Sequence, residues 1–257
     1  MDFSLAGKIA VVTGASSGMG RAIAIRFAEH GADVVVTGRD AARLEEVAAR
    51  VREHGRRALI VPADLMNPPE AAKPIEAAVK EFGRLDILVN NAGGAGFYVE
   101  HGSSKLLDTP FEAVEELFRL NTYSPYIACR AAAKIMKDQG GGVIINVTSV
   151  SAYSPGAEVH AYAAAKAALH ALTVAWSKDP VLAAHNIRVN EIVPGAVETR
   201  NLTNRIATPE GRKIMESGNP MGRLGQPDDV AAAAVYLASD EAAWLTGTEI
   251  RVSGGAR

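Results

Sequence analysis

Three side chains that could move a proton lie close together in the sequence: Ser149, Tyr162 and Lys166. From His160 onward good helix formers predominate, and no Gly or Pro occurs until Pro180, so a helix is expected there. Tyr162 and Lys166 are four residues apart and therefore share one face of that helix. A phenol loses its proton at about pH 10, and a neighbouring ammonium favours the phenolate. We therefore expect Lys166 to lower the pKa of Tyr162, which would make the phenol a proton donor and acceptor near neutral pH.

Ser149 ends the apolar run of residues 141–149 (GGVIINVTS), which is typical of a buried parallel strand. Its hydroxyl is thereby placed at the carboxyl end of the strand, the edge at which open α/β sheets bind ligands. An alternative interpretation stays open at this point. Tyr162 and Lys166 could form an ordinary solvated helix face, and Ser149 could simply end a strand.

A nucleotide site is indicated near the N-terminus. Residues 8–13 (KIAVVT) predict a short strand, and an amphipathic helix follows through His30. Between them lie Gly14, Ser16, Ser17, Gly18, Met19 and Gly20. The glycines allow the backbone to approach a phosphate, and the N–H groups and positive dipole end of the helix attract it. The spacing T-G-x-x-x-G-x-G is close to the general dinucleotide fingerprint, so we expect a bound dinucleotide rather than a tight turn without function.

The end of the second predicted strand, residues 33–37, bears on the choice of cofactor. Unphosphorylated cofactors are held there by an acid, whereas a 2′-phosphate needs a cation. Asp33 lies at the wrong end of this strand, and Asp40 is expected to cap the next helix. Arg39 can offer a guanidinium to a phosphate. We therefore expect NADP(H), with NAD(H) and a merely solvated Arg39 as the alternative.

A third strand is predicted over residues 57–62, and Asp64 and Leu65 follow it. The Asp64 carboxylate could accept a hydrogen bond from the adenine amino group, or it could equally be a turn or cap residue. The sequence leaves both interpretations open.

The fourth strand, residues 85–90 (LDILVN), ends in small and amide residues that suit close contact with a cofactor. These are Asn90, Ala92 and Gly93. The following segment, 94–110, is longer than a usual strand-to-helix connection and is expected to border a substrate pocket. It contains Phe97, Tyr98 and His101.

A long helical pattern over residues 111–138 is interrupted by Asn121 and Pro125. Pro125 has no N–H and clashes with the carbonyl of residue 121, so a bend that exposes a backbone carbonyl is expected, where water could bind.

The rest of the chain continues the alternation of strand and helix. A sixth strand ends before Pro194, residues 196–220 form a polar candidate lid, a last helix follows Pro227, and a final strand covers residues 248–253. Such alternation predicts an α/β fold, a Rossmann-like doubly wound parallel sheet of about seven strands with helices on both faces.

Composition limits the function classes. The 257 residues contain no linker-like stretch, so one domain over residues 1–257 is expected. With 27 basic and 29 acidic residues, a nucleic-acid or anionic-membrane partner is not expected. The single cysteine, Cys129, excludes an intrachain disulfide and a Cys-rich metal site, and we predict no bound metal. The sequence shows no signal peptide and no apolar window long enough for a membrane span, which predicts a cytoplasmic protein.

Together these residues resemble the short-chain dehydrogenase/reductase family in its single-domain form, from about residue 6 to residue 255. The matching motifs are TGASSGMG at 13–20, NNAG at 90–93, Asn121, Ser149, YAAAK at 162–166 and PGAVET at 194–199. Their joint order and spacing are specific. The resemblance implies a homotetramer or homodimer that pairs the helices at 111–137 and 160–178.

The resemblance also implies roles for individual residues. Tyr162 is the proton donor to a carbonyl or acceptor from an alcohol, and Ser149 hydrogen-bonds the substrate oxygen. Lys166 holds the nicotinamide ribose and lowers the pKa of Tyr162, while Asn121 anchors a water in the proton relay.

Further residues are implied to contact the cofactor. Thr199 and the backbone near Val197 contact the carboxamide, and Asn90 and Gly93 border the adenosine side. The full expected set is Gly14, Ser16, Ser17, Gly18, Met19, Gly20, Arg39, Asp64, Leu65, Asn90, Ala92, Gly93, Tyr162, Lys166, Pro194, Gly195, Val197 and Thr199.

Four features depart from the family pattern, the first being the long segment after NNAG. Pro180 lies where a helix normally continues, so the helix through Lys166 should kink or end early. Glu191 replaces a small residue in the sixth strand and needs a partner if it is buried. Reductases of carrier-protein thioesters often carry Arg where this chain has Gly141-Gly142 and Ala183, which weakens that reading.

The leading hypothesis is an NADP(H)-dependent oxidoreductase of ketones and secondary alcohols. NNAGG, ATPE at 207–210 and GRLGQPDDVA at 222–231 resemble bacterial hydroxysteroid dehydrogenases, which favours a bulky alicyclic or steroid-like alcohol. A 3-oxoacyl thioester is the alternative substrate. The hypothesis from another class is a non-catalytic NADP(H)-sensing protein on the same fold.

Overall fold

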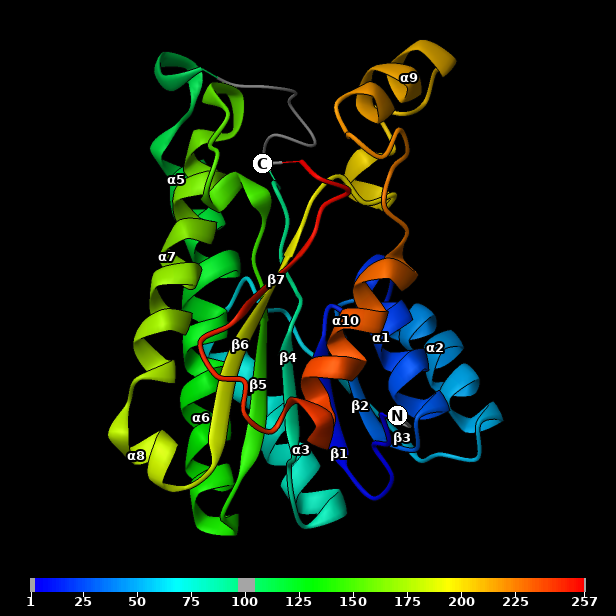
Figure 1. Cartoon of the computed structure of the whole chain (residues 1–257), viewed down its shortest axis with the longest axis vertical. Coiled ribbons are helices and arrows are strands. Elements are labelled where there is room, and N and C mark those ends of the chain that lie inside the picture. Colours follow the sequence, from blue (N-terminus) through cyan, green and yellow to red (C-terminus); the bar gives the residue numbers. More distant parts are fainter. Residues whose placement is uncertain (1–2, 97–104, 257) are drawn as a thin grey trace.

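A seven-stranded sheet, parallel throughout, forms the centre of the computed structural model, which describes residues 3–96 and 105–256 (Figure 1). Its order is β3-β2-β1-β4-β5-β6-β7, which confirms the predicted doubly wound sheet. The strands are β1 (Ile9–Thr13), β2 (Asp33–Gly38), β3 (Ala58–Pro62), β4 (Ile87–Asn90), β5 (Gly142–Val147), β6 (Ile187–Pro194) and β7 (Glu249–Val252). The chain moves outward from β1 to β3 and then crosses back to β4, so the order reverses between β1 and β4. Ligands bind at such a switch point.

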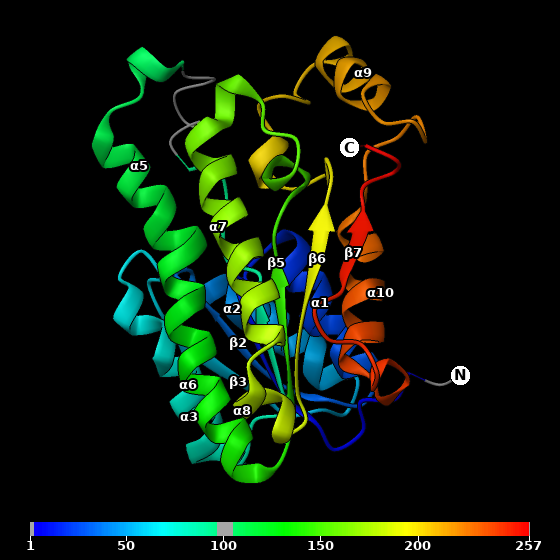
Figure 2. The ribbon, with the colours of Figure 1, turned by 60° about the vertical axis from the view of Figure 1, so that its left-hand side comes forward.

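The central strands are buried along their whole length because both faces are covered. Every residue of β1, β2 and β4 is buried. One face packs on α1 (Gly18–Glu29), α2 (Ala41–Glu53) and α10 (Pro227–Ala238). The other packs on α3 (Lys73–Phe82), α6 (Ser124–Gln139) and α7 (His160–Ser177), and Figure 2 shows α6 and α7 side by side over β5 and β6.

The predicted interruption of the long helix is confirmed as a π-helical turn. α5 (Phe111–Phe118) runs into π-helical residues Arg119–Tyr123, and α6 then starts at Ser124 with Pro125 in its first turn. A proline is tolerated at that position because the first N–H groups of a helix need no partner within it. Asn121 lies within the π-turn, where the wider backbone re-aims its side chain.

The predicted early end of the helix through Lys166 is also confirmed. α7 ends at Ser177, and the short α8 (Pro180–Ala184) starts afresh, with the Asp179 side chain accepting hydrogen bonds from Val181 N–H and Leu182 N–H.

The candidate lid contains more structure than the sequence indicated. It includes a 3-10 turn, Arg200–Leu202, and α9 (Pro209–Ser217), which begins at a Thr208 cap. Figures 1 and 2 both show α9 beyond the carboxyl ends of the strands. The remaining 3-10 turns are Pro68–Ala72, Leu106–Asp108, Val150–Ala152, Ala157–Val159 and Asp240–Ala242. No described helix has both the length and the apolar character needed to cross a bilayer.

Candidate active site

The carboxyl ends of β1, β4, β5 and β6 are neighbours in the sheet, so the segments that follow them meet at one edge. The Gly-rich turn follows β1, Ala92 and Gly93 follow β4, Ser149 follows β5, and Gly195 follows β6. The sheet order thus brings together residues that are far apart in the sequence. Phe97, Tyr98 and His101, expected to border a substrate pocket, lie outside the described residues.

Ser149, Tyr162 and Lys166 converge at the end of β5. The Lys166 ammonium is buried, lies 6.0 Å from the centroid of the Tyr162 ring, and donates a hydrogen bond to the Val147 carbonyl at 2.8 Å. The Ser149 hydroxyl accepts a hydrogen bond from Ser151 N–H at 3.1 Å, which fixes the start of the 3-10 turn Val150–Ala152, and it also hydrogen-bonds Tyr162. The shared helix face predicted for Tyr162 and Lys166 is therefore present, with Lys166 buried and Tyr162 partly buried.

Burial dominates the protonation of these two side chains. It lowers the pKa of Lys166 from 10.5 to about 8, against the opposing charge of Glu191. It raises the pKa of Tyr162, and the hydrogen bond with Ser149 only partly offsets this. The predicted lowering of the Tyr162 pKa is therefore wrong for the protein alone. Burial destabilises the phenolate more than the hydrogen bond with Ser149 stabilises it. Tyr162 is accordingly a protonated phenol near neutral pH.

The Asn121 side chain holds the segment that follows β4. Its Oδ1 accepts from Gly94 N–H and its Nδ2 donates to the Gly94 carbonyl, both at 3.0 Å, and Nδ2 also donates to Leu117 at 2.9 Å. A Cβ on Gly93 would lie 2.7 Å from Asn121 Oδ1 and 2.9 Å from Lys166 Nζ. Asn121 and Lys166 therefore flank Gly93, and all four predicted catalytic residues lie at one edge of the sheet.

The Gly-rich turn is built tightly enough to exclude side chains. Gly14 has a φ of 65°, and a Cβ on Gly20 would lie 2.4 Å from both Gly14 O and Asn91 Nδ2. Ser17 is the N-cap of α1 without a side-chain capping bond, which leaves the first-turn N–H groups available to an anion. These features fit the diphosphate of a nicotinamide dinucleotide, which the backbone can approach closely only where no Cβ projects.

Sequence reasoning missed two residues that shape this turn. The Thr13 hydroxyl accepts hydrogen bonds from Asn91 N–H and Ala92 N–H, each at 2.9 Å, and Asn91 Nδ2 donates to the Thr13 carbonyl at 2.9 Å. The available signals were the Thr before the first glycine and the second Asn of NNAG. These two residues join the end of β1 to the end of β4.

The residues predicted to select the cofactor lie at the end of β2. Arg39 is exposed there, and a Cβ on Gly38 would lie 3.4 Å from Ser16 Oγ, so the strand end borders the Gly-rich turn. Asp40 caps α2 by accepting from Arg43 N–H at 3.1 Å, as predicted. Asp33, at the far end of β2, hydrogen-bonds Arg56 Nε and Arg57 N–H and is structural.

Asp64 and Leu65 have clear structural roles. The Asp64 carboxylate accepts from Met66 N–H at 3.0 Å, which supports the turn reading that the sequence left open. The Leu65 side chain is buried in the core beside α3 and α6.

The Asn90 side chain points away from the strand edge. Its Nδ2 donates to Asn146 Oδ1 at 2.9 Å and to Cys129 Sγ at 3.1 Å, in a buried layer that continues to Thr173. Only the Asn90 backbone therefore lies at the edge. Cys129 packs inside the fold as expected.

The segment after β6 crosses toward α1. Pro194 ends the strand, Gly195 N–H donates to the Val252 carbonyl at 3.0 Å, and Val197 is buried in a bridge with Gly225. The Thr199 methyl lies 3.1 Å from the place a Cβ on Gly18 would take. Thr199 therefore closes the edge over the start of α1, near Met19. A cavity of about 780 Å³ lies beside it, between α1 and residues 198–207, and none of Ser149, Tyr162 or Lys166 lines it.

Comparisons with known proteins identify the family of the chain. A family profile described as enoyl-(acyl carrier protein) reductase matches residues 14–257. An L-rhamnose 1-dehydrogenase (NAD(P)(+)) of Sphingomonas sp. is 39% identical over 253 residues, covering 98% of this chain and 96% of that protein.

Two solved structures have the same fold. A 7α-hydroxysteroid dehydrogenase complexed with NADH and 7-oxo glycochenodeoxycholic acid superposes with a TM-score of 0.91 at 37% identity, covering 99% and 96% of the two chains. The Pseudomonas aeruginosa RhlG/NADP complex gives 0.89 at 34% identity, covering 98% and 97%. The chain is therefore an oxidoreductase of alcohol or ketone groups that uses a nicotinamide cofactor, and it belongs to the short-chain dehydrogenase/reductase family.

Proposed function

We propose that the chain, acting as one domain over residues 1–257, reduces a ketone or oxidises a secondary alcohol with NADP(H), and that Tyr162 is the general acid and base. The observation that carries this proposal is the convergence of Ser149, Tyr162 and Lys166 at the end of β5. The nicotinamide, when bound, supplies or accepts the hydride. Everything else in the reaction concerns the substrate oxygen and its proton.

In the reducing direction the substrate oxygen gains negative charge and then a proton. The Tyr162 hydroxyl supplies that proton, and its raised pKa keeps the proton in place until the oxygen becomes basic. The Ser149 hydroxyl donates a second hydrogen bond to the same oxygen, and such donors stabilise a developing oxyanion. In oxidation the same groups act in reverse.

Lys166 and Asn121 support this proton transfer. With a pKa of about 8, the Lys166 side chain is mostly ammonium at pH 7, and a positive charge beside Tyr162 favours the phenolate that remains once the proton has left. Lys166 also lies against Gly93, where it can hold the nicotinamide ribose. Asn121 holds the adjoining segment and is proposed to anchor a relay water.

The preference for NADP(H) over NAD(H) rests on Arg39. Its exposed guanidinium follows directly on β2, next to the Gly-rich turn, and no carboxylate competes for the 2′-position because Asp33 and Asp40 are committed to structural bonds. Among the residues that the structure describes, Arg39 takes part in no ion pair. A guanidinium fits a phosphate well.

We propose a bulky alicyclic or steroid-like alcohol as the substrate. Similar proteins act on a steroid and on a sugar, which supports a ring-bearing alcohol. A 3-oxoacyl thioester is the second candidate, since the description of the matching profile names a reductase of acyl groups on a carrier protein. Against it, this chain has Gly141-Gly142 and Ala183 where such reductases often carry arginine.

The same chain is proposed to form a homodimer or homotetramer. Phe111, Tyr123 and Tyr126, along the run from α5 to α6, are 70%, 51% and 45% exposed, which is unusual for large aromatic side chains. A second copy that covers this face would bury them.

The test is to follow NADPH and NADH oxidation side by side with oxo-steroids, alicyclic ketones, short aliphatic ketones and 3-oxoacyl thioesters. Turnover with NADPH that disappears in Tyr162→Phe supports the proposal. Full turnover in Tyr162→Phe refutes the acid/base role, and turnover only with short aliphatic ketones refutes the bulky substrate. NADPH binding with no turnover across the panel favours a non-catalytic sensing protein instead.

A further inference from the structure

Glu191 is a carboxylate buried inside the sheet. Its side chain is 2% exposed, and in β6 it lies between Asn146 of β5 and Glu249 of β7 in the strand register. A buried charge is costly unless it is paired and hydrogen-bonded. The sequence predicted that Glu191 would need a partner if buried, and the structure supplies two.

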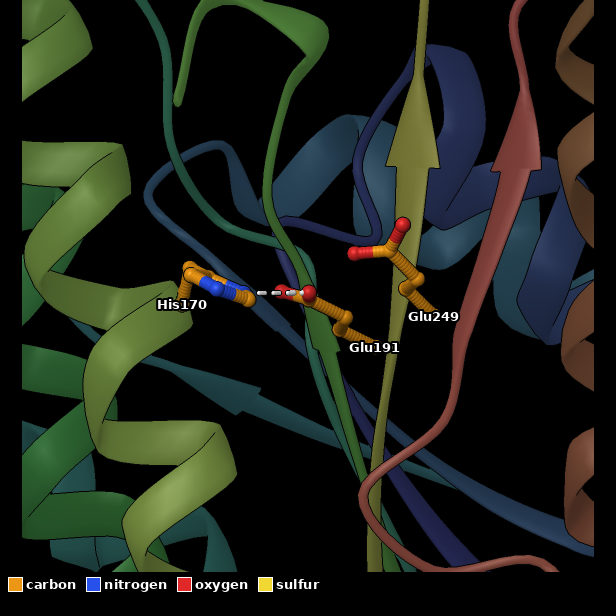
Figure 3. A group of neighbouring side chains, drawn as sticks. All are labelled: His170, Glu191 and Glu249. Carbon is orange, nitrogen blue, oxygen red and sulfur yellow. Dashed lines mark hydrogen bonds and ion pairs between the residues drawn. The ribbon is translucent and has the colours of Figure 1, made fainter. Parts of the chain in front are cut away.

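Those partners are Tyr153 and His170, and Figure 3 shows His170 beside Glu191. The Tyr153 hydroxyl donates a short hydrogen bond to Glu191 Oε1, and His170 Nδ1 lies 2.6 Å from the same oxygen. Tyr153 and His170 are themselves 2.8 Å apart. Within residues 3–96 and 105–256, the other carboxylate oxygen, Oε2, is buried with no hydrogen-bond partner, so the carboxylate is incompletely compensated.

Strand β7 supplies the outer boundary of this group. Glu249 hydrogen-bonds Tyr153, and Arg251 stacks on the Tyr153 ring at 4.3 Å and forms an ion pair with Glu249 at 2.9 Å. The charged or titratable groups around Glu191 are therefore Tyr153 after the Val150–Ala152 turn, His170 and Lys166 on α7, and Glu249 and Arg251 on β7.

The arrangement is a proton-sharing network rather than a cation site. Ligand atoms of His170, Glu191 and Glu249 lie within 4.8 Å of one another, a spacing that could hold a metal ion. However, the Tyr153 hydroxyl hydrogen-bonds His170 Nδ1 and donates to Glu191 Oε1, so both of these ligand atoms already have a partner.

Each partner of Glu191 lies close in the chain to a proposed catalytic residue. Tyr153 follows Ser149 by four residues, at the end of the 3-10 turn that Ser149 caps. His170 follows Lys166 by four residues, one helical turn along the same face of α7. One carboxylate in β6 thus holds both segments.

The charge of Glu191 also acts on Lys166. It is the opposing influence that raises the pKa of Lys166 while burial lowers it. Because the ammonium is buried, a fixed negative charge nearby is screened little by solvent.

We infer that Glu191 is a positioning residue for the proposed reaction: Tyr153 couples it to the segment that carries Ser149, and His170 couples it to the helix that carries Tyr162 and Lys166. This inference rests on the proposed function, because it assigns Glu191 a role only through those residues. It adds a fifth side chain, from a different strand, to the machinery.

The test compares Glu191→Gln with Glu191→Asp by the pH profile of kcat/KM for ketone reduction. Gln keeps the shape and can still accept from Tyr153, but it removes the charge. We expect the basic limb of the profile to move to lower pH by about one unit, since the Lys166 proton is lost more readily. Asp keeps the charge but is too short to reach both partners, so kcat should fall about 10-fold while the basic limb stays in place.

Three controls separate the possible failures. Glu45→Gln removes an exposed carboxylate of α2 that pairs with Arg52, and it should leave the profile unchanged. Tyr153→Phe removes the hydroxyl that links Glu191 to the Ser149 segment and buries no new charge. It should lower kcat and leave the basic limb of the pH profile in place. Unfolding temperature and NADPH affinity, measured for each variant, show that the fold is retained.

A Glu191→Gln variant with the wild-type profile and kcat, beside an inactive Tyr162→Phe, overturns this inference and leaves the proposed function intact. Full activity in Tyr162→Phe overturns the proposed function instead. One equivalent of divalent metal that copurifies with the protein and is lost in Glu191→Gln would show that the group is a cation site and would also overturn the inference.

Discussion

The Lys166 ammonium donates its hydrogen bond to the Val147 carbonyl, and this bond ties α7 to the last residue of β5. The charge is thereby kept inside the protein, where it is disfavoured. A pKa lowered from 10.5 to about 8 corresponds to about 3 kcal/mol against the ammonium in the folded state.

Lys166→Met should therefore stabilise the protein at pH 7 by about 1–3 kcal/mol while abolishing turnover. Below pH 8 the folded wild type carries the full cost of the buried charge. Between pH 8 and about 10.5 the folded state releases this proton while the unfolded state still holds it, so the cost fades as pH rises. Urea unfolding of both proteins at pH 7 and pH 10 measures this. A stability difference between Lys166→Met and the wild type that is as large at pH 10 as at pH 7 would contradict this prediction.

Gly93→Ala should lower kcat/KM about 100-fold. The new Cβ would lie 2.7 Å from Asn121 Oδ1 and 2.9 Å from Lys166 Nζ, so both side chains must move, and small displacements of catalytic groups cost about this much. Gly141→Ala is the matched control, because its Cβ would meet nothing nearer than 3.6 Å. Equal activity of the two variants would show that crowding Asn121 and Lys166 at position 93 does not disturb catalysis.

Arg39→Ala should lower kcat/KM for NADPH by about 100-fold and leave the value for NADH nearly unchanged, because only the 2′-phosphate loses a charge-assisted hydrogen bond. Arg43→Ala removes a neighbouring, half-buried arginine that pairs with Asp40, and it should not alter the ratio of the two values. A wild-type protein that prefers NADH would remove the basis for this role of Arg39.

Thr13 and Thr37 are register partners on β1 and β2, and they offer a comparison within one sheet. Thr13→Val should destabilise the protein by about 1–3 kcal/mol and weaken cofactor binding, because Asn91 N–H and Ala92 N–H lose their acceptor. Thr37→Val should be neutral or stabilising, since the buried Thr37 hydroxyl has no partner among the described residues. Chemical denaturation and a cofactor titration of both variants measure these effects.

Much of the fold could be predicted because its signals are local. Apolar runs ended by glycine or amide residues locate the strands, and Pro125 and Pro180 mark the helix interruptions that the structure contains. The helix α9 could not be predicted in the same way. It is nine residues long, mostly polar and without a buried residue, so it offers no run of core-facing apolar side chains on which such predictions depend.

Predictions about the site were reliable for position and less so for environment. The spacing of Tyr162 and Lys166 predicted their shared face, but the direction of the Tyr162 pKa depends on burial, which spacing does not reveal. Likewise, the motif located Asn90 at the end of β4, whereas the direction of its side chain depends on Asn146 in the neighbouring strand.

The buried layer beneath Asn90 also determines how the protein responds to thiol reagents. Cys129 is the only cysteine in the chain, and burial raises the pKa of its thiol to about 12, so almost no thiolate is present at neutral pH. Alkylating and oxidising reagents should not react with Cys129 while the fold is intact. A cysteine introduced on the exposed surface of α9 would then be the sole reactive thiol, so a fluorophore could report the position of α9 without removal of the native residue.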